Sequence, residues 1–274
     1  MHSAHPSNAQ LANGATRAQD GVAIDVQNVS VEFPTNQGEA FVALQDVDLQ
    51  IQKGSFVSFV GPSGCGKTTL LNAIAGLLPV SEGRIQYMGE ELRGVNSRTG
   101  YLTQRDLLLP WRTLERNVGL ALEIQHVSQD ERTCRVTEMI NRVGLSGFEK
   151  SYPSQMSGGM RKRATLARTL IYGPETLLMD EPFAAVDAIL RVSLHEMLLQ
   201  LWEREKITIV FVTHDLEEAI LLADQIVIFS SKPGRIVHVE DVPFPRPRNI
   251  MTSRSEPAFG QVWLKLWSYL GEAQ

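Results

Sequence analysis

The spacing of apolar residues along this chain predicts a mixture of strands and helices. Near the N-terminus, three short apolar runs bounded by turn-forming residues indicate an antiparallel sheet. The runs cover 23–26, 29–33 and 41–44, and Pro34, Asn36 and Gly38 separate them. A continuous apolar strand is then expected at 55–60, followed by a helix at 67–78 that Pro79 would end. A glycine-rich turn at 61–66 joins this strand to this helix.

The middle of the chain has a helical pattern. Thr113 is a candidate N-cap, and Ser128 with Glu131 forms a capping box ahead of a helix. The apolar face of that helix consists of Val136, Met139, Ile140 and Val143. We therefore expect a helical insertion at about 107–165.

Beyond the insertion, the pattern returns to alternating strands and helices. Buried strands are expected at 176–179 and 207–212, and a helix at 188–204 would join them as a βαβ unit. Two further strands, 226–229 and 236–239, flank a turn at Pro233 and Gly234. The last segment has apolar residues at helical spacing, and we expect this face to pack on the rest of the protein. It consists of Phe259, Val262, Trp263, Leu266, Trp267 and Leu270.

Composition divides the chain into three segments. Residues 1–21 are rich in Ala, Ser, Asn and Gln without an apolar period, which predicts a disordered tail. We expect one α/β domain at 22–250, with the helical insertion inside it, and an amphipathic helix at 251–274. With 274 residues, 43% of them hydrophobic, the chain is long enough for a sizeable core.

Charge and cysteine content exclude several classes of protein. A net charge of −5 and an isoelectric point of about 5.7 argue against the basic field that nucleic-acid binders use. No apolar run is long enough for a membrane-spanning helix, and no secretion signal is visible, so we expect a cytosolic location. Cys65 and Cys134 are too few for a disulfide framework, and we expect both to be reduced thiols.

The glycine-rich turn carries the most specific chemical motif. Gly61-Pro-Ser-Gly-Cys-Gly-Lys67-Thr68 fits the phosphate-loop pattern G-x-x-x-x-G-K-[ST], and the predicted strand and helix flank it as the motif requires. The glycines let backbone N–H groups point at phosphate oxygens. Lys67 supplies a charge to the β- and γ-phosphates, and the Thr68 hydroxyl ligates Mg²⁺. The expected nucleotide-binding residues are Gly61, Pro62, Ser63, Gly64, Cys65, Gly66, Lys67, Thr68 and Thr69.

Two adjacent carboxylates, Asp180 and Glu181, follow the strand expected at 176–179. Two charges at the end of an apolar strand are costly unless they meet a cation or water. Asp180 suits coordination of Mg²⁺, and Glu181 suits a general base that polarises the attacking water. An ordinary solvated acidic turn is the alternative, and the phosphate loop argues against it.

Ser157-Gly-Gly-Met160, which lies between these two motifs, resembles the signature loop of the ATP-binding cassette (ABC) transporter ATPases. The resemblance implies an α/β P-loop ABC-ATPase fold with an N-terminal antiparallel β subdomain and a helical insertion. It also implies ATP and Mg²⁺ as cofactors. Ser157, Gly158 and Gly159 open a predicted helix, so their N–H groups form a second anion site. In the family, this site faces the γ-phosphate held by the opposite subunit, and Met160 stands where Gln is common.

The remaining catalytic and metal-binding residues follow from the resemblance alone. It implies that Gln104 touches Mg²⁺ and the attacking water, and that His214 is the switch histidine that contacts the γ-phosphate. The expected catalytic residues are thus Glu181, His214 and Gln104. The expected metal-binding residues are Thr68, Gln104 and Asp180.

Three further positions have two interpretations each. Asp187 resembles a residue that communicates between subunits, and an N-cap for the next helix is equally compatible. Phe33 stands where the family places an aromatic that stacks on adenine; Phe41 competes for this role, and burial in the small sheet is the alternative for both. The apolar loop 107–113 lies where the family receives a coupling helix of the membrane subunit, unless the core buries it.

The basic run 161–163 is expected to be a solvated helical face rather than a nucleic-acid patch. Four longer segments resemble the nitrate, sulfonate and taurine importer branch of the family. They are Leu108-Leu-Pro-Trp-Arg-Thr, Met156-Ser-Gly-Gly-Met-Arg, Ser231-Lys-Pro-Gly-Arg235 and Pro243-Phe-Pro-Arg-Pro-Arg248.

The resemblance implies the ATP-hydrolysing subunit of an importer for a small anionic solute such as a sulfonate, taurine or nitrate. The implied partners are a second copy in an ATP sandwich, two transmembrane permease subunits and, indirectly, an extracytoplasmic solute-binding protein, with no nucleic acid. The implied location is peripheral, on the cytoplasmic face of the inner membrane. The alternative is a soluble ABC-type ATPase that acts on nucleic acid or ribosomes. Such proteins generally carry coiled-coil insertions or two cassettes, and this sequence has neither pattern.

Overall fold

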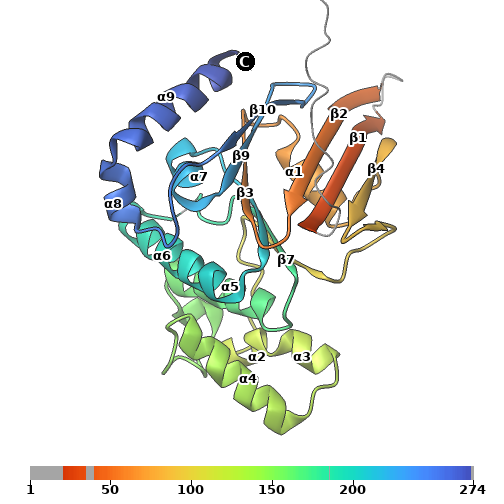
Figure 1. Cartoon of the computed structure of the whole chain (residues 1–274). Helices are drawn as coiled ribbons and strands as arrows, with labels where there is room; N and C mark the ends of the chain where they lie inside the picture. Colours follow the sequence, from red (N-terminus) through yellow and green to blue (C-terminus); the bar gives the residue numbers. More distant parts are fainter. Residues whose placement is uncertain (1–20, 35–39, 185, 273–274) are drawn as a thin grey trace, which may run out of the picture.

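The computed structural model describes residues 21–34, 40–184 and 186–272. These residues form two β-sheets with helices around them (Figure 1). The disordered tail expected at 1–21 lies outside the described residues except for Gly21, and so do Asn36 and Gly38.

The N-terminal sheet is antiparallel, as the apolar pattern predicts, and its strand order is β2-β1-β4-β5. Its strands are β1 Val22–Pro34, β2 Ala40–Gln52, β4 Glu82–Tyr87 and β5 Glu90–Glu91. The runs at 23–26 and 29–33 form one strand rather than two. Asn28 has a φ of 49°, and the register with β2 shifts between Val26 and Val29, so a bulge lets the strand continue. The pattern does not predict β4 and β5.

The second sheet has the strand order β10-β9-β3-β8-β7-β6. It consists of β3 Phe56–Val60, β6 Thr99–Leu102, β7 Thr176–Asp180, β8 Thr208–Val212, β9 Gln225–Phe229 and β10 Ile236–Asp241. Only β10 runs antiparallel to its neighbour. The five strands predicted in this region are therefore present, within two residues of their expected ends. Parallel strands direct their carboxyl ends to one edge of the sheet, where ligands bind in such folds.

Both faces of the parallel strands are buried, which explains their continuous apolar runs. The helices that cover the sheet are α1 Lys67–Ile74, α5 Gly158–Leu170, α6 Ala188–Glu205 and α7 Leu216–Leu222. In β3, Phe56 belongs to the hydrophobic cluster that includes α5, α6 and α7. Val57 and Phe59 belong to a second cluster with α1 and the antiparallel sheet. The alternation along β3 thus joins the two sheets into one body.

Helix α1 ends at Ile74, and the prediction that it continues to 78 is wrong. Gly76 takes a φ of 68°, a left-handed conformation that stops a helix before Pro79 is reached. A Cβ on Gly76 would lie 1.8 Å from the carbonyl oxygen of Gly94, so the backbone of a distant segment occupies the space that a side chain at 76 would need. The apolar pattern also does not predict α7.

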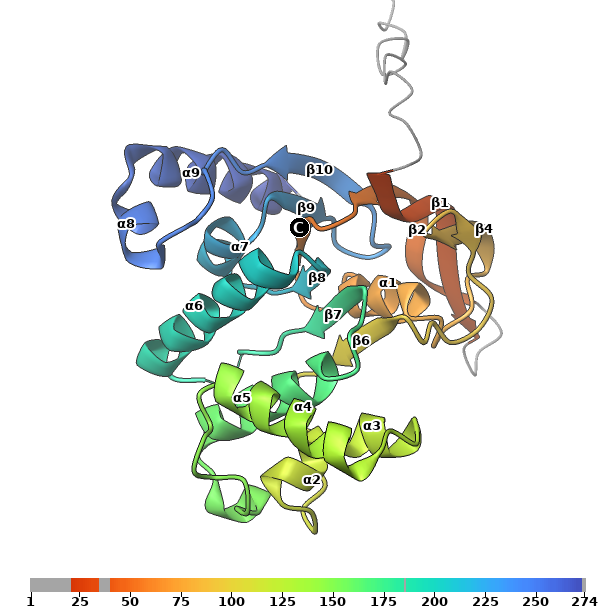
Figure 2. The same cartoon turned by 60° about the horizontal axis from the view of Figure 1, so that its bottom comes forward.

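A group of helices lies apart from both sheets (Figure 2). It includes α2 Leu114–Val118, α3 Leu120–Ile124 and α4 Gln129–Arg142. Ser128 caps α4 as predicted, accepting a hydrogen bond from the N–H of Glu131 at 3.4 Å. Thr113 occupies the N-cap position of α2, but its side chain makes no capping bond.

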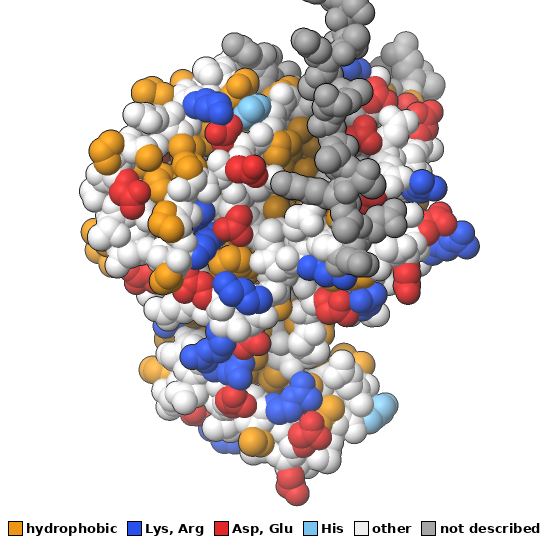
Figure 3. Space-filling view, viewed as in Figure 1, with side chains coloured by type: hydrophobic (Ala, Val, Ile, Leu, Met, Phe, Trp, Pro, Cys, Tyr) orange, Lys and Arg blue, Asp and Glu red, His pale blue; other side chains and the backbone are white. Residues whose placement is uncertain are grey.

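The C-terminal segment forms two helices, α8 Ile250–Ser255 and α9 Pro257–Glu272, rather than the single helix expected at 251–274. Val262 and Leu266 are buried as predicted, whereas Trp267 is 56% exposed, so the expected apolar face is only partly right. Hydrophobic side chains are visible on the surface of these helices, at the upper left of Figure 3. None of the helices in the described part of the chain is long and apolar enough to cross a membrane.

Candidate active site

The phosphate loop begins where β3 ends, in the middle of the parallel sheet, and leads into α1. Gly64 and Gly66 have φ values of 75° and 93°, which L side chains rarely adopt. A Cβ on Gly66 would lie 2.5 Å from Leu44 Cδ2 and 2.8 Å from the carbonyl oxygen of Ala43. Glycine is therefore required at 66, where the backbone turns into the N-terminus of α1 and directs its free N–H groups outward.

Lys67 lies inside this loop and is only 5% exposed. Its ammonium donates hydrogen bonds to the carbonyl oxygens of Gly61 at 2.8 Å and Pro62 at 2.9 Å, and it lies 3.5 Å from Cys65 Sγ. A buried cation is costly unless dipoles or an anion compensate it. Carbonyl dipoles meet this need here, and an anionic phosphate would meet it more strongly.

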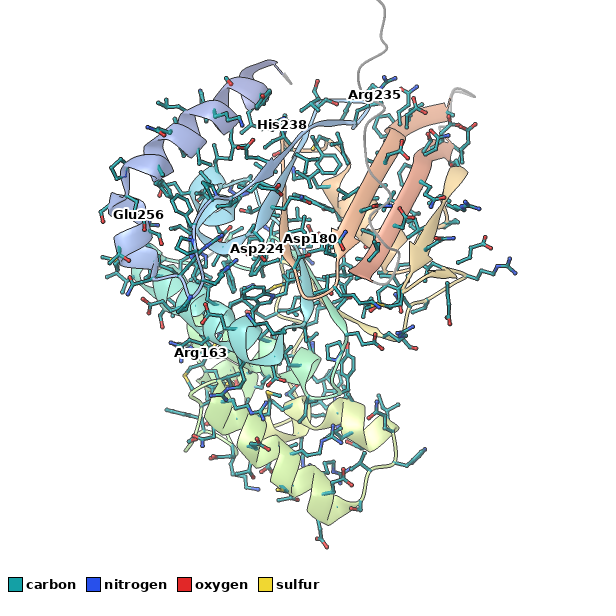
Figure 4. All side chains as sticks on the ribbon, viewed as in Figure 1. Arg163, Asp180, Asp224, Arg235, His238 and Glu256 are labelled. Atoms are coloured by element: carbon teal, nitrogen blue, oxygen red, sulfur yellow. The ribbon has the colours of Figure 1, made fainter. Side chains whose placement is uncertain are left out.

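Thr68 and Asp180 bring the phosphate loop and the end of β7 together. The Thr68 hydroxyl donates to Asp180 Oδ1 at 2.9 Å. Burial raises the pKa of Asp180, and the nearby charge of Glu181 raises it further, while Thr68 and Lys67 lower it in part. The pKa of Tyr101 is raised as well, mainly by burial and further by the charge of Asp180. The Tyr101 hydroxyl donates to Asn72 Oδ1 at 2.8 Å. Figure 4 shows Asp180 near the middle of the molecule.

The oxygen donors of Thr68 and Asp180 fit Mg²⁺, which prefers oxygen ligands and usually keeps several waters. A cation beside Asp180 would offset both the burial of this carboxylate and its repulsion by Glu181. Within residues 21–34, 40–184 and 186–272, no group of three or more His, Cys, Asp or Glu side chains could hold a metal ion alone. Any Mg²⁺ here would therefore depend on phosphate oxygens and water for most of its ligands.

Glu181 and His214 meet at the ends of the neighbouring strands β7 and β8. His214 Nδ1 lies 3.5 Å from Glu181 Oε1. Glu181 has a φ of 44°, an unusual conformation for a residue other than glycine, and its N–H donates to the carbonyl oxygen of Val212 at 3.0 Å. The carboxylate is about one quarter exposed, so water reaches it. The pair suits the positioning of a water molecule next to a phosphate.

A buried hydrogen-bond network supports the loop that carries His214. His195 Nε2 lies 2.6 Å from Glu218 Oε1, and the Thr213 hydroxyl donates to the other oxygen of Glu218. Thr213 Oγ1 in turn accepts from the N–H of Asp215 at 3.0 Å. None of the sequence motifs includes these residues. A signal exists, because Asp215 caps α7 and Glu218 follows it at capping-box spacing.

Gln104 follows β6, but no contact in the described part of the chain joins it to Thr68, Asp180 or Glu181. Its carbonyl oxygen accepts a hydrogen bond from Lys162 Nζ at 2.6 Å, and Lys162 also pairs with Asp106 at 2.9 Å. The expectation that 161–163 is a solvated face is only partly right, because 38% of the Arg161 side chain is exposed but only 11% of the Lys162 side chain. Arg161 donates to the carbonyl oxygen of Met156 and Arg163 to Ser193, so all three basic side chains have partners.

Ser157 is the N-cap of α5 and accepts a hydrogen bond from the N–H of Met160 at 3.3 Å. Ser157 and Gly158 are exposed, whereas Gly159 is buried: a Cβ on it would lie 2.5 Å from Leu190 Cδ1. Met160 is half-buried against the core. None of the contacts made by described residues joins Ser157 to the phosphate loop of the same chain.

Contacts in the structure bear on the two interpretations of Asp187, and exposure bears on those of Phe33 and Phe41. Asp187 caps α6 by accepting a hydrogen bond from the N–H of Leu190 at 3.0 Å, so the N-cap prediction is confirmed. Phe33 and Phe41 lie directly opposite each other on β1 and β2 and are 37% and 39% exposed. Opposed residues of an antiparallel pair share one face of the sheet. The two side chains thus share one exposed face of the sheet, and burial does not account for either.

The phosphate loop is also close to the loop after β9. Gly64 lies beside Lys232, whose ammonium is 5.4 Å from the centre of the Phe41 ring. Cys65 is buried and Cys134 is exposed, and both are free thiols as predicted.

Comparisons with known proteins agree with this geometry. Residues 44–184 match the model of the ABC transporter family. The chain is 44% identical to the aliphatic sulfonates import ATP-binding protein SsuB of Bacillus cereus over 230 residues, covering 82% of this chain and 89% of the relative. It is 41% identical to the taurine import ATP-binding protein TauB of Rhizobium johnstonii over 223 residues, covering 81% and 85%.

A solved structure of the ATP-binding cassette MJ0796, a dimer in a post-hydrolysis state bound to ADP and Pi, superimposes with a TM-score of 0.71. It is 30% identical, and the match covers 81% of this chain and all of that one. The fold is thus the P-loop ABC-ATPase fold, which binds nucleotide. The chain belongs to the ATP-hydrolysing, ATP-binding subunits of the ABC transporter family.

Proposed function

We propose that this chain powers an importer of small sulfonates, a class that includes taurine. The observation that carries the proposal is the junction of three motifs at one edge of the parallel sheet. Thr68 bonds to Asp180 at 2.9 Å, and the adjacent Glu181 lies 3.5 Å from His214. The names of the relatives, aliphatic sulfonates import and taurine import proteins, support the choice of solute class.

Each residue has a defined task in hydrolysis. The N–H groups of residues 61–69 hold the phosphates, and Lys67 exchanges carbonyl partners for phosphate oxygens. Thr68 and Asp180 would hold Mg²⁺, which supplies charge neutralisation at the phosphates when bound. Glu181 accepts a proton from the attacking water as a general base, and His214 orients that carboxylate and contacts the γ-phosphate. Gln104 joins this group only if the loop that carries it moves toward the nucleotide.

The exposed N-terminus of α5 supports a shared site between two copies of the chain. Ser157 and Gly158 are open to solvent and present free N–H groups, which favour an anion. In the proposed dimer, each of these termini meets the γ-phosphate on the partner's phosphate loop. The similar cassette MJ0796 is described as a dimer, which supports this arrangement.

A groove of about 710 Å³ among α2, α3 and α4 is the proposed contact with two transmembrane permease subunits. Trp111 lines it and is 70% exposed, and Leu107 nearby is 56% exposed. We place the protein peripherally on the cytoplasmic face of the inner membrane, with a solute-binding protein acting on the far side. We further propose a tail at 1–21 and a catalytic domain at 22–250, whose helical subdomain spans about 107–165.

Uptake by the complete system tests the proposal. Cells that express this chain with its membrane and binding subunits should import taurine or an alkanesulfonate, and Lys67→Ala should abolish uptake. Nitrate and an unrelated sugar serve as comparisons. If nitrate is taken up in preference to sulfonates, the proposed solute class is wrong. If the cells take up none of these solutes and the protein instead binds nucleic acid or ribosomes, the soluble ABC-type ATPase is favoured.

A further inference from the structure

The loop between β9 and β10 is fastened to both β2 and the phosphate loop. Gly234 donates its N–H to the carbonyl oxygen of Ala43 at 3.0 Å and accepts from the N–H of Gln45 at 3.0 Å. A Cβ on Gly234 would lie 1.9 Å from the carbonyl oxygen of Cys65. The backbone of this loop therefore has a fixed position beside the phosphate loop.

Lys232, two residues before Gly234, extends past the outside of the phosphate loop. Its Cε and Nζ lie 3.3 and 3.6 Å from the position that a Cβ on Gly64 would take. Its Nζ also lies 5.4 Å from the centre of the Phe41 ring. No carboxylate among the residues that the structure describes forms an ion pair with Lys232. The ammonium thus lies between a glycine of the phosphate loop and an exposed aromatic ring.

Lys232 differs from Lys67 in where its charge is available. Lys67 is buried and donates to carbonyl oxygens inside the loop, whereas Lys232 is exposed on the side of Phe41. A cation over an aromatic face is held loosely, by about 0.5–1 kcal/mol at exposed sites. The Lys232 ammonium is therefore positioned by the ring yet free to exchange this contact for an anion.

We propose that Lys232 is a nucleotide-binding residue that contacts the phosphate chain between the phosphate loop and the base. The inference rests on the proposed function, in which the phosphates occupy residues 61–69 and the base stacks on Phe33 or Phe41. A nucleotide that spans these two places passes the gap that Lys232 borders. An ammonium there complements the negative charge of the chain and adds a charge-assisted hydrogen bond.

The test compares Lys232→Met, which keeps the length of the side chain but removes its charge, with Lys232→Arg, which keeps the charge. Arg235, which is labelled in Figure 4, is the matched control, because it belongs to the same loop but forms an ion pair with Asp46 at 3.9 Å. Affinities of the full-length variants for ATP, ADP and adenosine are measured by equilibrium competition without Mg²⁺, so that hydrolysis does not interfere.

Lys232→Met should weaken ATP and ADP binding by about tenfold, as expected for one charge-assisted contact, and leave adenosine binding unchanged. The affinities of Lys232→Arg and Arg235→Met for ATP and ADP should stay within about twofold of the wild-type values. Added salt should reduce the difference in ATP affinity between the wild type and Lys232→Met. Equal losses for adenosine would place Lys232 at the base and overturn the phosphate contact.

Two outcomes separate this inference from the proposed function. If the wild type does not bind ATP, the proposed function fails. If the wild type binds ATP and Lys232→Met binds it equally well, only the role of Lys232 fails. Thermal unfolding without nucleotide should be the same for both proteins because Lys232 is exposed, and Lys232→Gln repeats the comparison with a polar side chain.

Discussion

Replacing Trp111 with Ser should separate ATP hydrolysis from assembly with the membrane subunits. Trp111 is 70% exposed and lines the groove among α2, α3 and α4, so its ring contributes little to the fold. The isolated variant should therefore unfold at nearly the same temperature as the wild type and hydrolyse ATP at a similar rate. Its affinity for the permease pair should fall.

The size of this loss follows from the exposed area of the ring. An aromatic side chain buries roughly 150–250 Å² when fully covered. Because 70% of Trp111 is free, roughly 100–175 Å² remains for a partner. At about 25 cal/mol per Å², full coverage would be worth about 3–4 kcal/mol per subunit, or a loss of affinity on the order of a hundredfold or more.

Co-purification of tagged protein with the detergent-solubilised permease pair measures the loss directly. Ile124→Ser is the matched control, because Ile124 is 68% exposed but does not line the groove. Leu108→Ser provides the contrast, since Leu108 is buried and its replacement should destabilise the isolated protein. Normal assembly of Trp111→Ser would refute the docking surface, and unfolding of this variant alone would assign Trp111 to the fold.

Three further predictions concern the site. Glu181→Gln should keep ATP affinity but lower turnover by about 10²- to 10⁴-fold, and normal steady-state turnover would exclude the general base. Ser157→Arg should bind ATP but hydrolyse little, because a large cation blocks closure, and mixing it with Lys67→Ala should restore partial activity through one intact composite site. Full activity of Ser157→Arg alone would contradict the shared site. Burial raises the pKa of Asp180, so its contribution to stability is fully present below its unfolded value of about 3.9 and is lost as pH rises through the higher folded pKa. Asp180→Asn should therefore raise the melting temperature of the nucleotide-free protein at pH 7 but not at pH ~3.5, and a pH-independent difference would assign the effect to packing.

Local pattern was sufficient for β3, β7, β8, β9 and β10 and for the α1 start at Lys67, because each depends on neighbouring residues, but it did not predict the edge strand β6. It failed where distant segments decide the outcome. Helix α1 ends at Ile74 because Gly76 turns the chain against Gly94, and the bulge at Asn28 joins two apolar runs into one strand. Sequence spacing also cannot show that Lys162 turns back to the carbonyl oxygen of Gln104, since 58 positions separate them.

The candidate site was predictable in its motifs but not in its supporting contacts. The phosphate-loop pattern and the acidic pair each indicate phosphate and Mg²⁺ binding directly from the residue types. The hydrogen bond between Thr68 and Asp180 brings the two motifs together. Lys232 has no comparable local signal, because its surroundings come from other loops. Glu218 has only its capping-box spacing after Asp215, which does not predict its contact with His195 on another helix. Phe33 and Phe41 could not be distinguished because both rings occupy the same exposed end of the sheet.

Adjacent glycines at the start of α5 have different tolerances to substitution. Gly159 has Leu190 where its Cβ would lie, whereas the nearest atom to a Cβ on Gly158 is the end of the Arg161 side chain at 3.9 Å. Gly159→Ala would therefore push α5 away from α6. It would also shift the residues that follow Asp187, which belong to α6. Gly158→Ala would change only the surface that faces the partner in the proposed dimer. If two copies associate as proposed, an engineer who wishes to tune their affinity without disturbing the fold has one usable glycine at the start of α5, and it is Gly158.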